Sequence, residues 1–109
     1  MEPKGTGIDS AQPVAMMQTS TLCVHFRVCG QVQGVFYRAS TEATARRLGL
    51  SGWVRNVENG EVELVACGPA PQLDELEKWL WRGPANARVT SVVRTLLPFQ
   101  HFRGFEVRR

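Results

Sequence analysis

Nine residues, Gly30 to Arg38, have the composition of a site that binds an anion. Their sequence, GQVQGVFYR, connects an alternating hydrophobic stretch to a helical one through two glycines. Backbone N–H groups can therefore point inward with no side chain in the way. No Asp or Glu occurs between Ser10 and Thr41, so no nearby carboxylate neutralises this concavity. The segment predicts a small bound anion, although it is not a P-loop, because the GxxxxGK(S/T) spacing is missing.

Arg38 lies where the first turn of the helix is expected, and its charge there opposes the helix dipole by about 0.3–1 kcal/mol. An external phosphate between Arg38 and the N–H groups would offset this cost. A guanidinium group suits phosphate, because it can donate two parallel hydrogen bonds. The segment on its own also fits two simpler interpretations, an ordinary glycine-rich turn and a solvated arginine.

The hydrophobic pattern predicts the elements that must position these groups. Strands are expected over residues 22–28, 50–56, 61–67, 87–96 and 105–108. One helix is expected over residues 36–48, with Ala39, Ala43 and Leu48 on its inner face. A second helix is expected to begin at Pro71, because Leu73, Leu76 and Leu80 follow at three- and four-residue spacing. This βαββαβ order, with a short terminal strand, predicts an α+β fold of the ferredoxin-like split βαβ type, in which two helices cover one face of an antiparallel sheet. Strands one and two then run parallel on either side of strand three. Arg38 and Asn56 are therefore expected at the same edge of the sheet.

Two motifs at this edge resemble those of the acylphosphatase family. They are Gly30-x-Val32-Gln33-Gly34-Val35-x-x-Arg38 and Gly49-Leu50-x-Gly52-Trp53-Val54-x-Asn56, followed by Gly60-x-Val62-Glu63. The similarity runs from about Leu22 to the C-terminus, including the Phe105-x-Val107-Arg108 ending. The resemblance implies hydrolysis of acyl phosphates, which are carboxyl–phosphate mixed anhydrides, to a carboxylate and inorganic phosphate. It also implies a cytosolic monomer that uses no cofactor and no metal.

The resemblance further implies roles for individual residues. Arg38 matches the arginine that binds the phosphoryl oxygens, and Asn56 matches the asparagine that orients the attacking water. The matching loop supplies backbone N–H donors from Gln31, Val32, Gln33, Gly34 and Val35. The chain departs from the family pattern at Gln31, where a basic residue is frequent, at Tyr37, where Phe is more usual, and at Val57, where many members carry Thr. These departures bear on the turnover rate more than on the type of reaction.

Two other functions share features of this sequence. A non-catalytic module that binds phosphate or acyl phosphate would keep the same loop, and only its rate would differ. An RNA-recognition domain shares the order of elements but needs exposed aromatic side chains on its central strands. The expected third strand reads Glu61-Val62-Glu63-Leu64-Val65, which is acidic and contains no aromatic residue. The sequence therefore predicts no nucleic-acid partner.

Composition and length restrict the class of protein. With 109 residues and 43% hydrophobic residues, the chain is expected to form one soluble domain over residues 21–109, preceded by a flexible extension over residues 1–20. The net charge of +3 suits an anionic ligand. No apolar stretch approaches the roughly 18 residues of a membrane span, and the N-terminus does not match a signal peptide, so a cytoplasmic location is expected.

The three cysteines do not form a secreted disulfide framework. Cys23, His25 and Cys29 would share a strand face, but the outer two lie about 20 Å apart and cannot bind one metal ion. In the predicted fold, Cys23 and Cys67 lie on neighbouring antiparallel strands, which makes a cross-strand disulfide geometrically possible. Two free thiols are the alternative that a cytosolic location favours.

Overall fold

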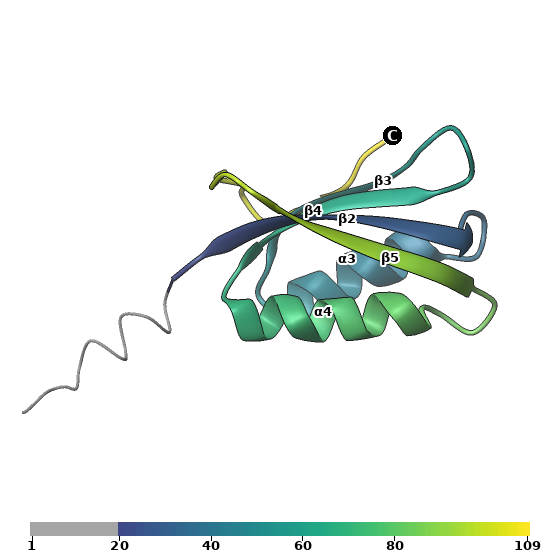
Figure 1. Cartoon of the computed structure of the whole chain (residues 1–109), viewed down its shortest axis with the longest axis horizontal. Coiled ribbons are helices and arrows are strands. Elements are labelled where there is room, and N and C mark those ends of the chain that lie inside the picture. Colours follow the sequence, from purple (N-terminus) through teal and green to yellow (C-terminus); the bar gives the residue numbers. More distant parts are fainter. Residues whose placement is uncertain (1–19) are drawn as a thin grey trace, which may run out of the picture.

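The computed structural model describes residues 20–109 and contains five strands and two helices in that part of the chain. Their order is β2 (Leu22–Gln31), α3 (Tyr37–Arg47), β3 (Ser51–Asn56), β4 (Val62–Gly68), α4 (Ala70–Arg82), β5 (Arg88–Leu97) and β6 (Phe105–Val107). Both helices lie on the same face of the sheet (Figure 1). The predicted ferredoxin-like α+β fold is confirmed. Nearly all of the expected extension, residues 1–20, lies outside the described residues, so the domain boundary stays a prediction.

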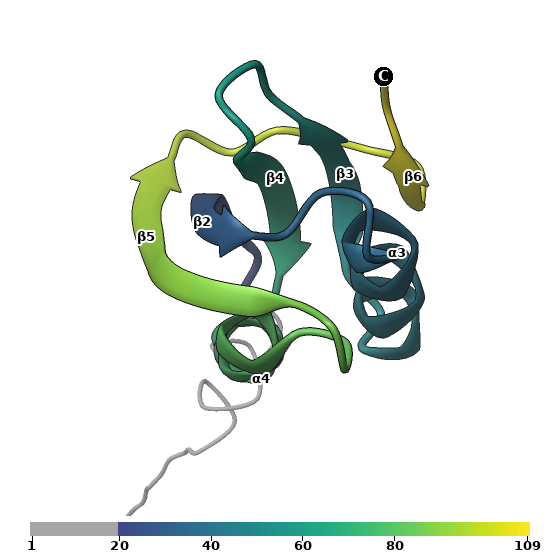
Figure 2. The ribbon, with the colours of Figure 1, turned by 90° about the vertical axis from the view of Figure 1, so that its right-hand side faces the viewer.

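The sheet has the strand order β5-β2-β4-β3-β6, with β4 between β2 and β3 as expected. Val28 of β2 and Asn56 of β3 both pair with Val62 of β4, so the C-terminal ends of β2 and β3 lie at one edge. The four strands β5, β2, β4 and β3 pair antiparallel as expected, and the exception is β6, which pairs parallel with β3. β5 runs opposite to β3, and the chain crosses to the far edge of the sheet before β6 begins (Figure 2). The last strand therefore runs in the direction of β3.

Between the sheet and the helices lies one hydrophobic core. Strand residues at alternate positions face it, and α4 contributes leucines at three- and four-residue spacing, as predicted. Its largest fully buried members from these elements are Phe26, Phe105, Leu64, Leu73, Leu76 and Leu80. Burying a side chain of this size contributes about 1.5–3 kcal/mol to stability.

The inner face of α3 differs from the expected one. Ala39 and Ala43 are exposed, whereas Thr41 and Thr44 are buried. The hydroxyl of Thr41 donates a hydrogen bond to the Tyr37 carbonyl at 2.8 Å, which allows a polar residue to lie in the core. The prediction was wrong for Ala39 and Ala43, whereas Leu48 packs against the core as expected.

Tyr37 fixes the start of α3 against α4. Its ring is buried and lies 5.5 Å from the Trp79 ring, centroid to centroid. Its hydroxyl donates to the Leu80 carbonyl at 2.6 Å, near the end of α4. Burial raises the pKa of this hydroxyl well above its ordinary value near 10, so it remains a donor. The N-terminus of α3, which carries Arg38, is therefore held by the core. Trp81, which follows Leu80 in α4, is 48% exposed.

Candidate functional site

The connection between β2 and α3 leaves its backbone N–H groups free. β2 ends at Gln31, and residues 32–36 lie between the two elements. Among residues 20–109, the N–H groups of residues 32–36 find no hydrogen-bond acceptor. The first hydrogen bond of the helix joins the Ser40 N–H to the Phe36 carbonyl, so the N–H groups of residues 37–39 are unpaired as well. A run of free donors therefore surrounds the start of α3.

Two residues with positive φ shape this connection. Gly34 has φ 74°, a conformation that glycine adopts at little cost. Phe36 precedes the helix with φ 63°, and its side chain cannot cap the free N–H groups. The first turn of α3 contains no acidic residue. Since neither a capping side chain nor a carboxylate satisfies the positive end of the helix, an external anion is the group that suits it.

Arg38 is available to such an anion. It is half-buried, and no ion pair or hydrogen bond joins it to another residue between 20 and 109. Other arginines do pair with acids; Arg27, for example, lies 3.4 Å from Glu61. Arg38 lines a hollow of about 320 Å³ together with Val32, Gly34, Phe36, Tyr37, Ala39 and Val107. The free guanidinium and the free N–H groups thus border the same space.

The side chain of Gln33 ties this connection to the hairpin between β3 and β4. Its Nε2 donates to the Val57 carbonyl and to the Glu61 carbonyl, both at 2.8 Å. The Val57 N–H in turn donates to the Glu61 carbonyl at 2.9 Å, which closes the hairpin. Sequence reasoning considered only the backbone N–H of Gln33 and missed this role. Nothing in the spacing indicates it, because the partners are backbone carbonyls on a segment remote in sequence.

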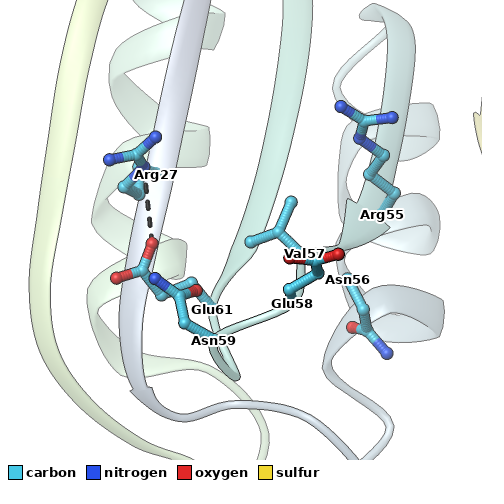
Figure 3. Close-up of a pocket in the computed structure, with 7 residues that line it drawn as sticks. All are labelled: Arg27, Arg55, Asn56, Val57, Glu58, Asn59 and Glu61. Carbon is cyan, nitrogen blue, oxygen red and sulfur yellow. Dashed lines mark ion pairs between the residues drawn. The ribbon is translucent and has the colours of Figure 1, made fainter.

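Asn56 is the last residue of β3 and directly precedes the hairpin that Gln33 holds. Its Oδ1 is buried and has no hydrogen-bond partner among the described residues. A buried acceptor without a donor costs about 1–3 kcal/mol, so a water molecule that donates to Oδ1 would be bound firmly. The carboxamide of Asn56 points away from the other labelled side chains (Figure 3). The arrangement can hold and orient one water.

A second hollow, of about 450 Å³, lies beside the same hairpin and is lined by Arg27, Arg55, Asn56, Val57, Glu58, Asn59 and Glu61 (Figure 3). Arg27 pairs with Glu61 across it, and Arg55 pairs with Glu63 nearby. Burial tends to raise the pKa of Glu63, but hydrogen bonds from His25 and Arg55 outweigh it and bring that pKa below its usual range. Because these opposite charges are paired with one another, we expect this hollow to attract an anion less strongly than the hollow beside Arg38.

The structure thus brings the predicted residues to one edge of the sheet without placing them in one hollow. Residues 32–34 belong to the connection before α3, Arg38 lies in the first turn of α3, and Asn56 is the last residue of β3. Gln33 joins the two parts. Gln31 is the end of β2, where it pairs with Arg88 of β5. In the part of the chain that the structure describes, no three His, Cys, Asp or Glu side chains gather to hold a metal ion.

Comparison with known proteins gives one consistent family. The family model described as acylphosphatase matches residues 24–107. An acylphosphatase from Pseudomonas paraeruginosa is 51% identical over 88 residues, covering 81% of this chain and 97% of the relative. An acylphosphatase from Legionella pneumophila is 44% identical over 89 residues, covering 82% of this chain and 98% of the relative. The solved structure of an acylphosphatase from Coxiella burnetii superposes with a TM-score of 0.79 at 43% identity, covering 81% of this chain and 93% of that chain.

Proposed function

This chain belongs to the acylphosphatase family, and on that premise we propose roles for its residues in the hydrolysis of acyl phosphates. Arg38 and the backbone N–H groups of Gln31, Val32, Gln33, Gly34 and Val35 bind the phosphoryl oxygens. Asn56 orients the attacking water. The free donors that surround the hollow beside Arg38 are the observation that carries this assignment.

The chemistry needs placement and charge stabilisation more than proton transfer. The water oxygen forms a bond to phosphorus while the bond between phosphorus and the bridging oxygen breaks. The electron pair of that bond leaves with the carboxylate, which is stable as an anion and needs no protonation. One proton of the water stays on the attacking oxygen, and the other passes to a phosphate oxygen of the substrate. Asn56 holds the water but takes no proton, because a carboxamide is not a useful base at neutral pH.

Arg38 and the N–H groups stabilise the charge on the phosphoryl oxygens as the reaction proceeds. A preorganised set of donors does this without reorganisation, and the core contacts of Tyr37 hold the helix start in place. The non-catalytic phosphate-binding module is not favoured, because the relatives that cover most of the chain are named as the enzyme.

The test is hydrolysis of benzoyl phosphate by the full chain in the presence of EDTA. We expect turnover that the chelator leaves unchanged, with benzoate and inorganic phosphate formed in equal amounts. Hydrolysis in ¹⁸O-water identifies the bond that breaks. The label is expected in phosphate rather than in benzoate, because the water attacks phosphorus. No hydrolysis by a folded protein whose melting temperature still rises with phosphate would instead support the binding module.

We also propose a cytoplasmic monomer with no nucleic-acid partner. Its hydrophobic core is complete within one chain, and the charged residues on the outer sheet face pair with one another. None of the helices among the described residues is long and apolar enough to cross a membrane.

Cys23 and Cys67 lie opposite each other on β2 and β4, with their sulfur atoms at bonding distance. We propose that they form a disulfide when the protein is oxidised, whereas a reducing cytoplasm keeps both thiols free. Cys29 remains a free thiol. Thiol titration of the unfolded, air-oxidised protein is expected to find one thiol before reduction and three afterwards. Equal counts before and after reduction would contradict the disulfide.

A further inference from the structure

Phe36 is exposed and lines the same hollow as Arg38. It is 81% exposed, more than the other large hydrophobic side chains that are exposed in residues 20–109. Its backbone has φ 63°, a conformation that disfavours bulky residues and is suited to glycine or asparagine. Neither core packing nor backbone preference therefore accounts for a phenylalanine here. Residues held in such conformations tend to occur at ligand sites, which suggests a role for the exposed ring.

The lining of the hollow combines polar and apolar groups. Arg38 and the free N–H groups are the polar part. Apolar surface comes from Phe36, from exposed Ala39 and from Val107, which is 37% exposed. β6, which carries Val107, is fixed to α3, because the Arg46 guanidinium donates two hydrogen bonds to the Phe105 carbonyl, at 2.9 and 3.0 Å. Both apolar parts of the lining are therefore set relative to Arg38.

An acyl phosphate likewise combines a charged part and a part that can be apolar. Its phosphoryl group is anionic, and a single bridging oxygen connects it to the acyl group. When Arg38 and the N–H groups hold the phosphoryl oxygens, the acyl group must lie in the adjoining part of the same hollow. We propose that Phe36 and Val107 form the subsite for the acyl group and that the enzyme prefers acyl phosphates with an aromatic or bulky apolar acyl group. This inference rests on the proposed binding of phosphate at Arg38.

The ring of Phe36 contributes contact area with little loss of conformational freedom, and aromatic groups pack well against it. A short acyl group such as acetyl ends before it can cover the ring, so it gains little from the subsite. The preference is expected in the ratio of kcat/KM for two substrates that share the phosphoryl group, because selectivity is a difference in transition-state binding.

The experiment compares benzoyl phosphate with acetyl phosphate in the wild type and in Phe36→Ala and Phe36→Asn. Asparagine tolerates positive φ, so Phe36→Asn removes the ring without adding backbone strain. We expect both variants to lose about tenfold in kcat/KM for benzoyl phosphate and less than about twofold for acetyl phosphate. Inhibition by inorganic phosphate is expected to stay within about twofold of the wild type, since phosphate does not reach the subsite.

Phe99→Ala is the matched control. Phe99 is 65% exposed and follows β5, whose last residue, Leu97, pairs with Cys23 at the opposite end of β2 from the hollow. This variant is expected to leave both substrates unaffected. An equal loss for both substrates in the Phe36 variants, or no change for benzoyl phosphate, would overturn the subsite while leaving the hydrolase intact. A wild type inactive on both substrates would instead overturn the proposed residue roles and the subsite with them.

Discussion

Arg38→Ala is expected to lower kcat/KM for benzoyl phosphate by at least about 10²-fold, with the fold unchanged. Arg38 lines the hollow and makes no ion pair or hydrogen bond with another residue between 20 and 109, so its removal breaks no such bond there. The variant loses the charged donor that stabilises the phosphoryl oxygens in both the bound substrate and the transition state. We therefore expect KM to rise and kcat to fall together. Steady-state kinetics and inhibition by inorganic phosphate measure the effect, and circular dichroism checks the fold.

Two further variants separate charge from geometry at this position. Arg38→Lys keeps the charge but cannot donate two parallel hydrogen bonds, so we expect a loss smaller than that of Arg38→Ala yet clearly measurable. Arg47→Ala is the control for net charge, since Arg47 is an exposed arginine at the other end of the same helix. It is expected to change kcat/KM by less than about twofold. Equal losses in Arg47→Ala and Arg38→Ala would mean that only the overall charge matters and would contradict the assigned role.

The parts of the fold that depend on local pattern were predictable from the sequence. The alternation of apolar residues in β2 and the leucine spacing of α4 identify one element each, and they appear in the structure with small shifts at their ends. The pairing of β6 depended on the path of the chain after β5, for which no local signal exists. The inner face of α3 was missed because a threonine can be buried when its hydroxyl bonds to the preceding turn.

The same distinction applies to the site. Arg38 and the glycines of its connection could be identified, because charge, turn chemistry and the absence of acids are visible in one short segment. Asn56 was located through its motif and through the topology of the sheet. The two hydrogen bonds of Gln33 and the exposure of Phe36 could not be predicted. Both depend on how the β3–β4 hairpin and β6 lie relative to the connection between β2 and α3. Only the three-dimensional structure shows these positions.

Asn56→Ala is expected to lower kcat by at least about 10²-fold while KM and inhibition by inorganic phosphate change little. Asn56 contacts the water rather than the phosphoryl group in the proposed mechanism, so its loss affects attack and leaves phosphate binding in place. The contrast with Arg38→Ala, where binding weakens as well, is the signature that separates the two roles. Single-turnover kinetics, with the enzyme in excess of benzoyl phosphate, measure the chemical step directly.

Stability gives an independent check on Asn56. Its Oδ1 is a buried acceptor without a partner in residues 20–109, and replacing such a group with alanine removes a desolvation cost. We therefore expect the free energy of unfolding to fall by no more than about 1 kcal/mol, although activity is nearly lost. A residue whose role was to hold the hairpin would show the opposite pattern, with a large loss of stability and a parallel loss of phosphate binding.

Asn59→Ala is the matched control, since Asn59 lies in the same hairpin and lines the second hollow, of about 450 Å³, together with Asn56. It is expected to leave kcat within about threefold of the wild type. Asn56→Asp provides the sharpest comparison, because it keeps an oxygen acceptor for the water but adds a negative charge near the phosphoryl group. That charge should repel the substrate, so KM is expected to rise in Asn56→Asp and not in Asn56→Ala. A wild-type kcat in Asn56→Ala would show that the water is oriented by another group.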